Sequence, residues 1–141
     1  MKLNIISESK RRIPRKKIAR LVRLIEEEED PPGSTVNIIF TGDRRLAALN
    51  RKYRNRIGPT DVLSFNFDDS FGPDALLGEI YISTDTAQKN LQVFGGTIQS
   101  ELLRLCCHGL LHLLGYDHAG DKDGAVMRRR EEYYMRKLNR C

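Results

Sequence analysis

The chain has 141 residues, the size of one ordinary domain, and its 40% hydrophobic content suffices for a core. The 30% charged content and the lack of any apolar run near ~20 residues argue against a membrane-spanning protein. The net charge of +5 permits a polyanionic partner without establishing one. In the first 17 residues a short apolar patch precedes the charges, the reverse of a secretory signal, so we expect a cytoplasmic protein with no membrane partner.

The first half of the chain alternates between patterns typical of strands and of helices. Residues 2–7 predict a strand, residues 14–30 a helix with Pro14 in its first turn, 35–41 a second strand and 43–53 a second helix. The expected inward-facing residues are Ile18, Leu21, Val22 and Ile25, then Val36, Ile38 and Phe40, then Leu46, Leu49 and Tyr53.

The second half predicts two strands followed by three helices. Strands 62–67 and 76–83 are placed to form a hairpin, and a helix over 83–94 ends at two glycines. Thr97 caps the next helix, which ends near Leu114, and a final helix begins at about residue 121. The expected apolar faces carry Leu63, Phe65 and Phe67 in the hairpin and Met127, Tyr134 and Leu138 in the last helix. Together these elements predict a single α+β domain over residues 1–141, with a small mixed four-stranded sheet flanked by helices.

A cluster of histidines gives the strongest indication of function, because all three histidines of the chain fall within the eleven residues HGLLHLLGYDH. His108 and His112 are one helical turn apart, so their imidazoles share a face and can reach one ion. Gly115 ends the helix and permits a sharp turn that can bring His118 to the same ion. Three imidazoles with an open fourth position are typical of catalytic zinc.

The three cysteines are not expected to add to this site. Cys106 and Cys107 point away from the face that His108 shares with His112, and we interpret them as small core residues. With Cys141 they make an odd number, which indicates reduced thiols.

The spacing of the three histidines is that of the metzincin proteases, with one difference. Those enzymes place a glutamate directly after the first histidine as general base, whereas this chain has Gly109. A metalloprotease-like hydrolase therefore remains an alternative that lacks its base.

The motif HGLLHLLGYDH also resembles the signature of the YbeY family of bacterial rRNA-maturation endoribonucleases. A second block, LNRKYRNRIGPTDVLSF at 49–65, resembles another characteristic segment of that family. The strand LLGEIYIS at 76–83, with Glu79 at an expected acidic position, resembles the segment between them. The blocks occur in the family's order and span most of residues 36–118.

The resemblance implies a zincin-like three-histidine site on a helix and the turn that follows it. It implies one Zn²⁺ held by His108, His112 and His118, and a catalytic role for Arg54. The implied activity is single-strand-specific cleavage of RNA in 16S rRNA 3′-end maturation and ribosome quality control. The implied partners are rRNA and ribosomal particles.

Zinc can polarise a phosphoryl oxygen, and the guanidinium of Arg54 can meet two phosphate oxygens through its planar fork. The attacking group is either a zinc-bound hydroxide or the ribose 2′-hydroxyl, and the sequence favours neither. We expect substrate contacts from Arg51, Lys52, Arg56 and Ser64, which surround Arg54 in the sequence. Without the family resemblance, Arg54 would be interpreted as an ordinary surface arginine.

Several acidic residues near the motif have two interpretations each. Asp61, with Thr60, either orients Arg54 or the RNA, or stabilises a turn. Asp117 either supports a neighbouring ligand or the turn, and Glu101 either shares the ligand face or forms a salt bridge with Arg104. Glu131 interrupts the apolar stripe of the last helix and needs a buried partner or partial exposure, but the sequence does not name that partner.

Basic residues form three clusters, at 10–17, 44–56 and 128–130, which RNA phosphates would favour. Charge alone fits an ordinary solvated surface equally well. A non-catalytic rRNA- or ribosome-binding module with structural zinc is the second alternative, although structural zinc usually has four protein ligands. The oligomeric state is not predicted.

Overall fold

The computed structural model describes residues 1–30, 35–66, 76–116 and 121–140, with side chains described for all of these except 121–123. The elements in chain order are β1 (Lys2–Ser7), α1 (Arg15–Glu29), β2 (Thr35–Thr41), α2 (Asp43–Arg54), β3 (Val62–Asn66), β4 (Leu76–Ser83), α3 (Thr84–Phe94), α4 (Ile98–Leu113) and α5 (Asp121–Asn139).

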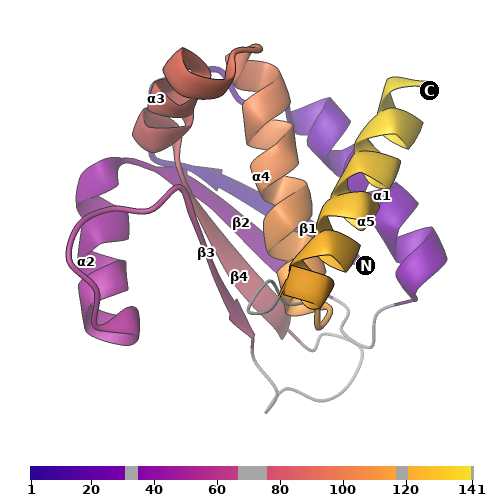
Figure 1. Ribbon diagram of the computed structural model, residues 1–141, viewed down its shortest axis with the longest axis horizontal. Coiled ribbons are helices and arrows are strands. Elements are labelled where there is room, and N and C mark those ends of the chain that lie inside the picture. Colours follow the sequence, from indigo (N-terminus) through magenta and orange to yellow (C-terminus); the bar gives the residue numbers. More distant parts are fainter. Residues whose placement is uncertain (31–34, 67–75, 117–120, 141) are drawn as a thin grey trace.

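The four strands form one mixed sheet in the order β1-β2-β4-β3. β1 and β4 pair in parallel with the two sides of β2, and β3 pairs antiparallel with β4, so the predicted hairpin is confirmed. Figure 1 shows α4 lying across one face of the sheet with α1 and α5 beside it, and α2 at the opposite side of the molecule. The predicted α+β class and mixed four-stranded sheet are therefore confirmed.

The hydrophobic core lies between the sheet and the helices α1 and α4. The predicted stripe of α1 and the β2 residues predicted to face inward are almost completely buried, and so are Ile80 and Ile82 on β4. Because Ile38 pairs with Ile80 and Phe40 with Ile82, the two parallel strands present one continuous apolar face. These residues are Ile18, Leu21, Val22, Ile25, Val36, Ile38, Phe40, Ile80 and Ile82.

The inner face of α2 differs from the prediction. Tyr53 was predicted to face inward, but it is 57% exposed, and its ring packs at a steep angle against that of Phe65 with the centroids 5.2 Å apart. Asn50 is buried in its place, beside Leu46. The reason is that Asn50 satisfies its amide by donating to the carbonyl oxygen of Gly58 at 3.0 Å, which ties the following loop to the helix.

Two glycines let α4 lie directly on the sheet. A Cβ at Gly109 would lie 2.5 Å from Cγ2 of Ile80, and one at Gly78 would lie 2.6 Å from Cδ2 of Leu113. Both distances are too short for real carbon atoms, so the helix and β4 could not approach this closely with any side chain at either position.

A polar cluster fastens α5 to α1. Glu29, at the end of α1, accepts hydrogen bonds from Arg130 at 2.6 Å, from Tyr116 at 2.9 Å and from Tyr134. Tyr134 is fully buried, and its position on a stripe with Met127 and Leu138 confirms the predicted inner face of α5. Within the described ranges, no helix combines the length and apolarity needed to cross a membrane.

The close helix–sheet contact predicts that Gly109→Ala is destabilising. Overpacking typically costs about 1–3 kcal/mol, and the gain in helix propensity returns at most about 1 kcal/mol. With that gain subtracted, we expect a net loss of up to about 2 kcal/mol in the free energy of unfolding, measured by urea denaturation. Ser100→Ala, at an exposed position of the same helix, is the control and should change little. A stabilised Gly109→Ala variant would contradict the packing described here.

The Glu29 cluster predicts a loss of stability in acid. Burial alone would raise the pKa of Glu29, but hydrogen bonds from Tyr134, Arg130 and Tyr116 outweigh it and hold that pKa below its ordinary value of 4.5. A lowered pKa in the folded state contributes stability above the unfolded value, and this contribution is lost as pH falls through the folded pKa. We expect the melting temperature of Glu29→Gln to fall less than that of the wild type between pH 6 and acid pH. The exposed neighbour Glu27→Gln should follow the wild-type curve.

Candidate active site

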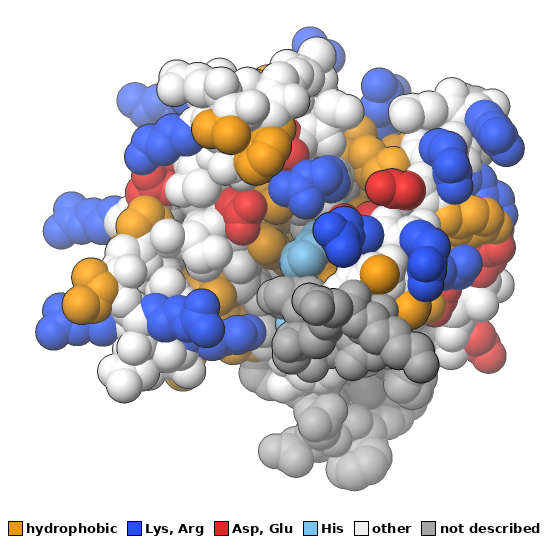
Figure 2. Space-filling view, in the orientation of Figure 1, with side chains coloured by type: hydrophobic (Ala, Val, Ile, Leu, Met, Phe, Trp, Pro, Cys, Tyr) orange, Lys and Arg blue, Asp and Glu red, His pale blue; other side chains and the backbone are white. Residues whose placement is uncertain are grey.

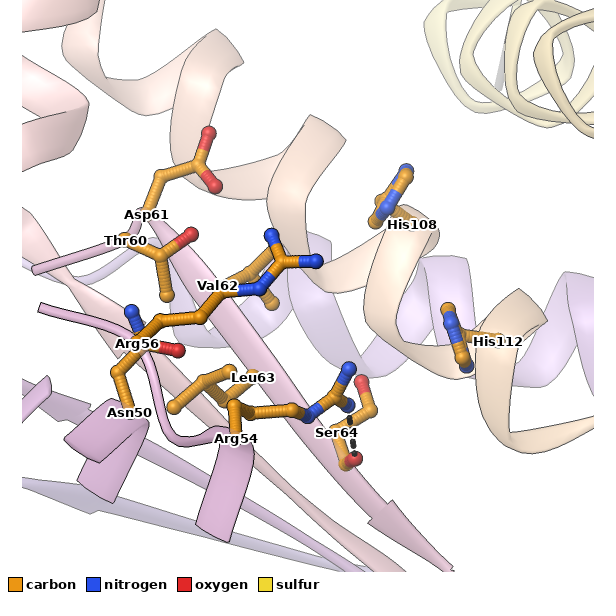
Figure 3. A pocket seen from close by; sticks show the side chains of 10 residues that line it. All are labelled: Asn50, Arg54, Arg56, Thr60, Asp61, Val62, Leu63, Ser64, His108 and His112. Atoms are coloured by element: carbon orange, nitrogen blue, oxygen red, sulfur yellow. Dashed lines mark hydrogen bonds between the residues drawn. The ribbon is translucent and has the colours of Figure 1, made fainter. Parts of the chain in front are cut away.

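A pocket of about 210 Å³ lies between α4 and the segment that joins α2 to β3. Ten residues line it: Asn50, Arg54, Arg56, Thr60, Asp61, Val62, Leu63, Ser64, His108 and His112. Figure 3 shows the side chains of Arg54 and Arg56 extending from one wall toward the helix that carries the two histidines. The structure thus brings together residues that are about fifty positions apart in the sequence.

Helix α4 places the two histidines one turn apart, as the sequence predicts. The helix begins where the Thr97 hydroxyl oxygen accepts from the amide of Ser100 at 3.1 Å. It ends before Gly115, whose φ of +103° is in the left-handed region and whose amide donates to the carbonyl oxygen of His112. His118 and Asp117 lie outside the described residues. Among the residues that are described, no group of three potential metal ligands comes together.

His108 is bound from the side by Glu131 of α5. The carboxylate Oε1 of Glu131 contacts Nδ1 of the imidazole. Glu131 is 7% exposed and lies on a stripe of α5 that is otherwise apolar. This contact supplies the buried partner that a carboxylate on such a stripe requires.

A second polar group borders His108 on the α3 side. Arg104 binds Glu101 through two parallel hydrogen bonds of 2.8 and 2.9 Å, and its guanidinium lies 4.0 Å from Asp61. Burial alone would raise the pKa of Glu101, but hydrogen bonds from Arg104 and Asn90 outweigh it and lower that pKa. Glu101 therefore forms the predicted salt bridge, and Asp61 accepts a hydrogen bond from Asn90 at 3.2 Å.

The opposite wall carries the two arginines of the pocket. Arg54 is the last residue of α2, and its Nη2 donates to the main-chain oxygen of Ser64 at 3.4 Å. Arg56 follows in the loop, where its main-chain amide donates to the carbonyl oxygen of Asn50 at 3.3 Å. Asn50 thus holds the loop at two points, through this carbonyl and through its side-chain bond to Gly58.

Ser64 joins the strand to the helix at the floor of the pocket. Its hydroxyl donates to the carbonyl oxygen of Gly109 at 3.1 Å, and Asn66, two residues along β3, donates to that of Leu113 at 2.9 Å. These bonds hold β3 against α4, so the arginine bound to Ser64 keeps its position relative to the histidines.

The two other predicted substrate contacts, Arg51 and Lys52, are exposed on α2 and do not line the pocket. Lys52 lies instead over the ring of Tyr53, with its Nζ 5.1 Å from the ring centroid. Figure 2 shows a histidine side chain at the surface with several lysine or arginine side chains around it. The pocket lining itself holds two arginines and one carboxylate, that of Asp61, a balance that favours an anionic substrate.

Comparison with known proteins assigns the chain to a family. The family profile described as Endoribonuclease YbeY matches residues 4–139. The chain belongs to the YbeY family. The resemblance seen in the sequence is thereby confirmed, and it extends well beyond the histidine motif.

Relatives and a solved structure agree with this YbeY assignment. A YbeY endoribonuclease from Aquifex aeolicus is 34% identical over 138 residues, covering 97% of this chain and 92% of the relative. One from Nautilia profundicola is 44% identical over 104 residues, covering 74% of this chain and 72% of the relative. The solution structure of TM1509 from Thermotoga maritima superposes with a TM-score of 0.64 at 30% identity, covering 96% of this chain and 88% of that one.

Sequence reasoning missed one residue and one pairing that shape this YbeY site. Asn50 lies four positions after Leu46, and a polar residue on that inner stripe was the signal for its role in holding the loop. The partner of Glu131 was not identified either, since a pattern within one helix does not show what packs against it. The interpretation of Cys106 and Cys107 as core residues is confirmed, and burial raises the pKa of both thiols.

The hydrogen bond from Asn50 to the loop predicts that Asn50→Ala loosens the segment carrying Arg56. A typical hydrogen bond contributes about 0.5–1.5 kcal/mol, which corresponds to an approximately 2–12-fold faster local opening. We expect amide hydrogen exchange to accelerate by that factor in residues 55–61, with α4 unchanged. Arg51→Ala, an exposed neighbour on α2, is the control. Unchanged exchange in the loop would show that Asn50 does not hold it.

Proposed function

We propose that this protein is a zinc-dependent, single-strand-specific endoribonuclease that acts on rRNA in 16S 3′-end maturation and ribosome quality control. The observation that carries the proposal is the pocket in which Arg54 and Arg56 face His108 and His112 across a small cationic opening. Membership of the YbeY family supports it, because the relatives of this chain are named as endoribonucleases.

The donor set of the pocket fits zinc. Two imidazoles one turn apart on a helix are a common pair of zinc ligands, and His118 is the proposed third. The contact of Glu131 with Nδ1 of His108 leaves Nε2 as the ring nitrogen to face an ion. When bound, the zinc would supply a Lewis acid for a phosphoryl oxygen.

The arginines supply the complementary charge. Hydrolysis of a phosphodiester increases negative charge on the phosphoryl oxygens, and a guanidinium meets two such oxygens with its planar fork. Arg54 is aimed at the floor of the pocket by its bond to the Ser64 carbonyl, so it is the proposed catalytic arginine. The RNA strand around the reacting phosphate would be positioned by Arg56 and Ser64 in the pocket and, further out, by Arg51 and Lys52.

The metalloprotease-like alternative loses support on geometric grounds. The position that carries a glutamate in those enzymes is Gly109, which faces Ile80 with no room for even a Cβ. No carboxylate could reach the pocket from that position in this fold. Among the described residues that line the pocket, Asp61 is the acidic one, and it is bound by Asn90.

A non-catalytic module with structural zinc would need a fourth protein ligand. Cys106 and Cys107 are the nearest thiols in the sequence, and both are buried in the core. Absorption spectra of the cobalt-substituted protein distinguish the two cases, because a thiolate ligand gives an intense charge-transfer band. We expect no such band.

We predict that wild-type protein binds about one equivalent of zinc and cleaves single-stranded RNA. His112→Ala should lose both zinc and cleavage, because it removes a ligand. Arg54→Ala should retain zinc but lose cleavage by at least 100-fold, the effect expected when one group that stabilises transition-state charge is removed. Zinc content is measured by atomic absorption, and cleavage with a labelled oligoribonucleotide.

The matched control is Arg23→Ala, which removes an exposed arginine from α1 that does not line the pocket. It should bind zinc and cleave like the wild type. Equal cleavage by wild type, His112→Ala and Arg54→Ala would reject the proposed function. A double-stranded RNA of the same sequence tests the strand preference and should be cut poorly.

A further inference from the structure

Glu131 is a carboxylate with an unusual position. Its neighbours on the inner stripe of α5, Met127, Tyr134 and Leu138, are buried apolar or aromatic residues, and Glu131 is only 7% exposed among them. Burial of a charge is costly unless it is paired and hydrogen-bonded. A carboxylate here therefore serves either stability or His108, the pocket residue that it contacts.

The contact that Glu131 makes is specific to one ring nitrogen. Its Oε1 meets Nδ1 of His108, and the two side chains come from different helices, 23 positions apart in the sequence. A carboxylate accepts hydrogen bonds and does not donate them, so Nδ1 carries the proton in this pair. A metal ion binds an unprotonated ring nitrogen, so the metal ligand of His108 in this arrangement would be Nε2.

Two further features hold Glu131 in place. Arg130, the preceding residue, is fastened to Glu29 and Tyr134, so the helical turn that carries Glu131 is bound to α1. Arg104 faces Glu131 from α4, and its pKa is raised first by its hydrogen bonds to Glu101 and also by the negative charge of Glu131. The carboxylate of Glu131 is thus held in place by α5, and the positive charge of Arg104 lies near it, whether or not a metal is bound.

We propose that Glu131 is a positioning residue for the zinc site, which fixes the tautomer and ring orientation of His108 and strengthens zinc binding through it. This inference rests on the proposed function, because it requires that His108 bind zinc. Loss of a carboxylate partner of this kind typically lowers metal affinity by about 10–100-fold, because the partner holds the imidazole ring and makes it a stronger ligand.

The test measures the zinc dissociation constant without RNA, by competition with a chromophoric chelator. Glu131→Leu removes both the charge and the acceptor and should weaken zinc binding by about 10–100-fold. Glu131→Gln retains an acceptor oxygen without the charge and should weaken it by at least threefold. Glu132→Gln makes the same charge change at the adjacent exposed position and should stay within twofold of the wild type.

A second readout separates positioning from stability. In zinc-loaded wild-type protein, NMR should show a slowly exchanging Nδ1 proton on His108 that is absent from Glu131→Leu and shifted in Glu131→Gln. Melting temperatures of the metal-free variants report any purely structural effect. If Glu131→Leu does not fold, the affinity and NMR shift of Glu131→Gln decide the question.

The results that overturn the inference differ from those that overturn the function. Wild-type zinc affinity in folded Glu131→Leu, or in Glu131→Gln if the former does not fold, would overturn the inference alone. So would zinc-loaded wild type without the Nδ1 proton, because Glu131 or Nδ1 would then bind the metal directly. Wild-type protein that binds zinc no more tightly than His112→Ala would instead reject the proposed zinc site itself.

Discussion

The direct contact between α4 and the sheet is the constraint on which the rest of the structure depends. Gly109 and Gly78 remove the side chains that would separate helix and strand, and the Ser64 hydroxyl completes the contact by bonding the helix backbone. His108 precedes the closest point of contact and His112 follows it by one turn. Both therefore face the edge where β3 meets the helix, and the pocket forms at that edge.

Two separate sets of hydrogen bonds hold the loop that follows α2 and the helix α5 in place. Asn50 bonds the loop that follows α2, and this bonding sets the position of both pocket arginines. Outside the pocket, Glu29 binds Arg130 and two tyrosines, and so fixes against α1 the helix α5 that carries Glu131, the partner of His108. Asn50 itself lines the pocket, whereas the Glu29 cluster lies outside it and acts on His108 only through the position of α5.

Much of the fold could be predicted from the sequence because its local signals agree. Helical and alternating apolar periods, the capping threonine at 97 and the glycine at 115 mark the elements and their ends. The histidine pair follows from helical spacing alone. The third proposed ligand, His118, stays a prediction because it lies outside the described residues.

The other features of the fold and the site depend on contacts between segments that are distant in the sequence, and a local sequence pattern does not show such contacts. Periodicity placed Tyr53 on the inner face of α2, but the loop's need for a hydrogen-bond donor buries Asn50 in its place. Periodicity likewise identified Glu131 as anomalous on its stripe without indicating His108 as the reason. A one-dimensional pattern shows which face of a helix is inward, whereas the packing of α5 on α4 decides what that face meets.

The position of α5 has a consequence for how the protein is made. Met127, Tyr134 and Leu138 of α5 are buried in the hydrophobic core, so the sheet and α4 alone leave part of that core uncovered. The carboxylate that binds His108, and the tyrosine and arginine that fix α5 to Glu29, are synthesised only after these elements. A nascent chain would therefore complete both its core and the contact at His108 only when α5, the last described helix, docks.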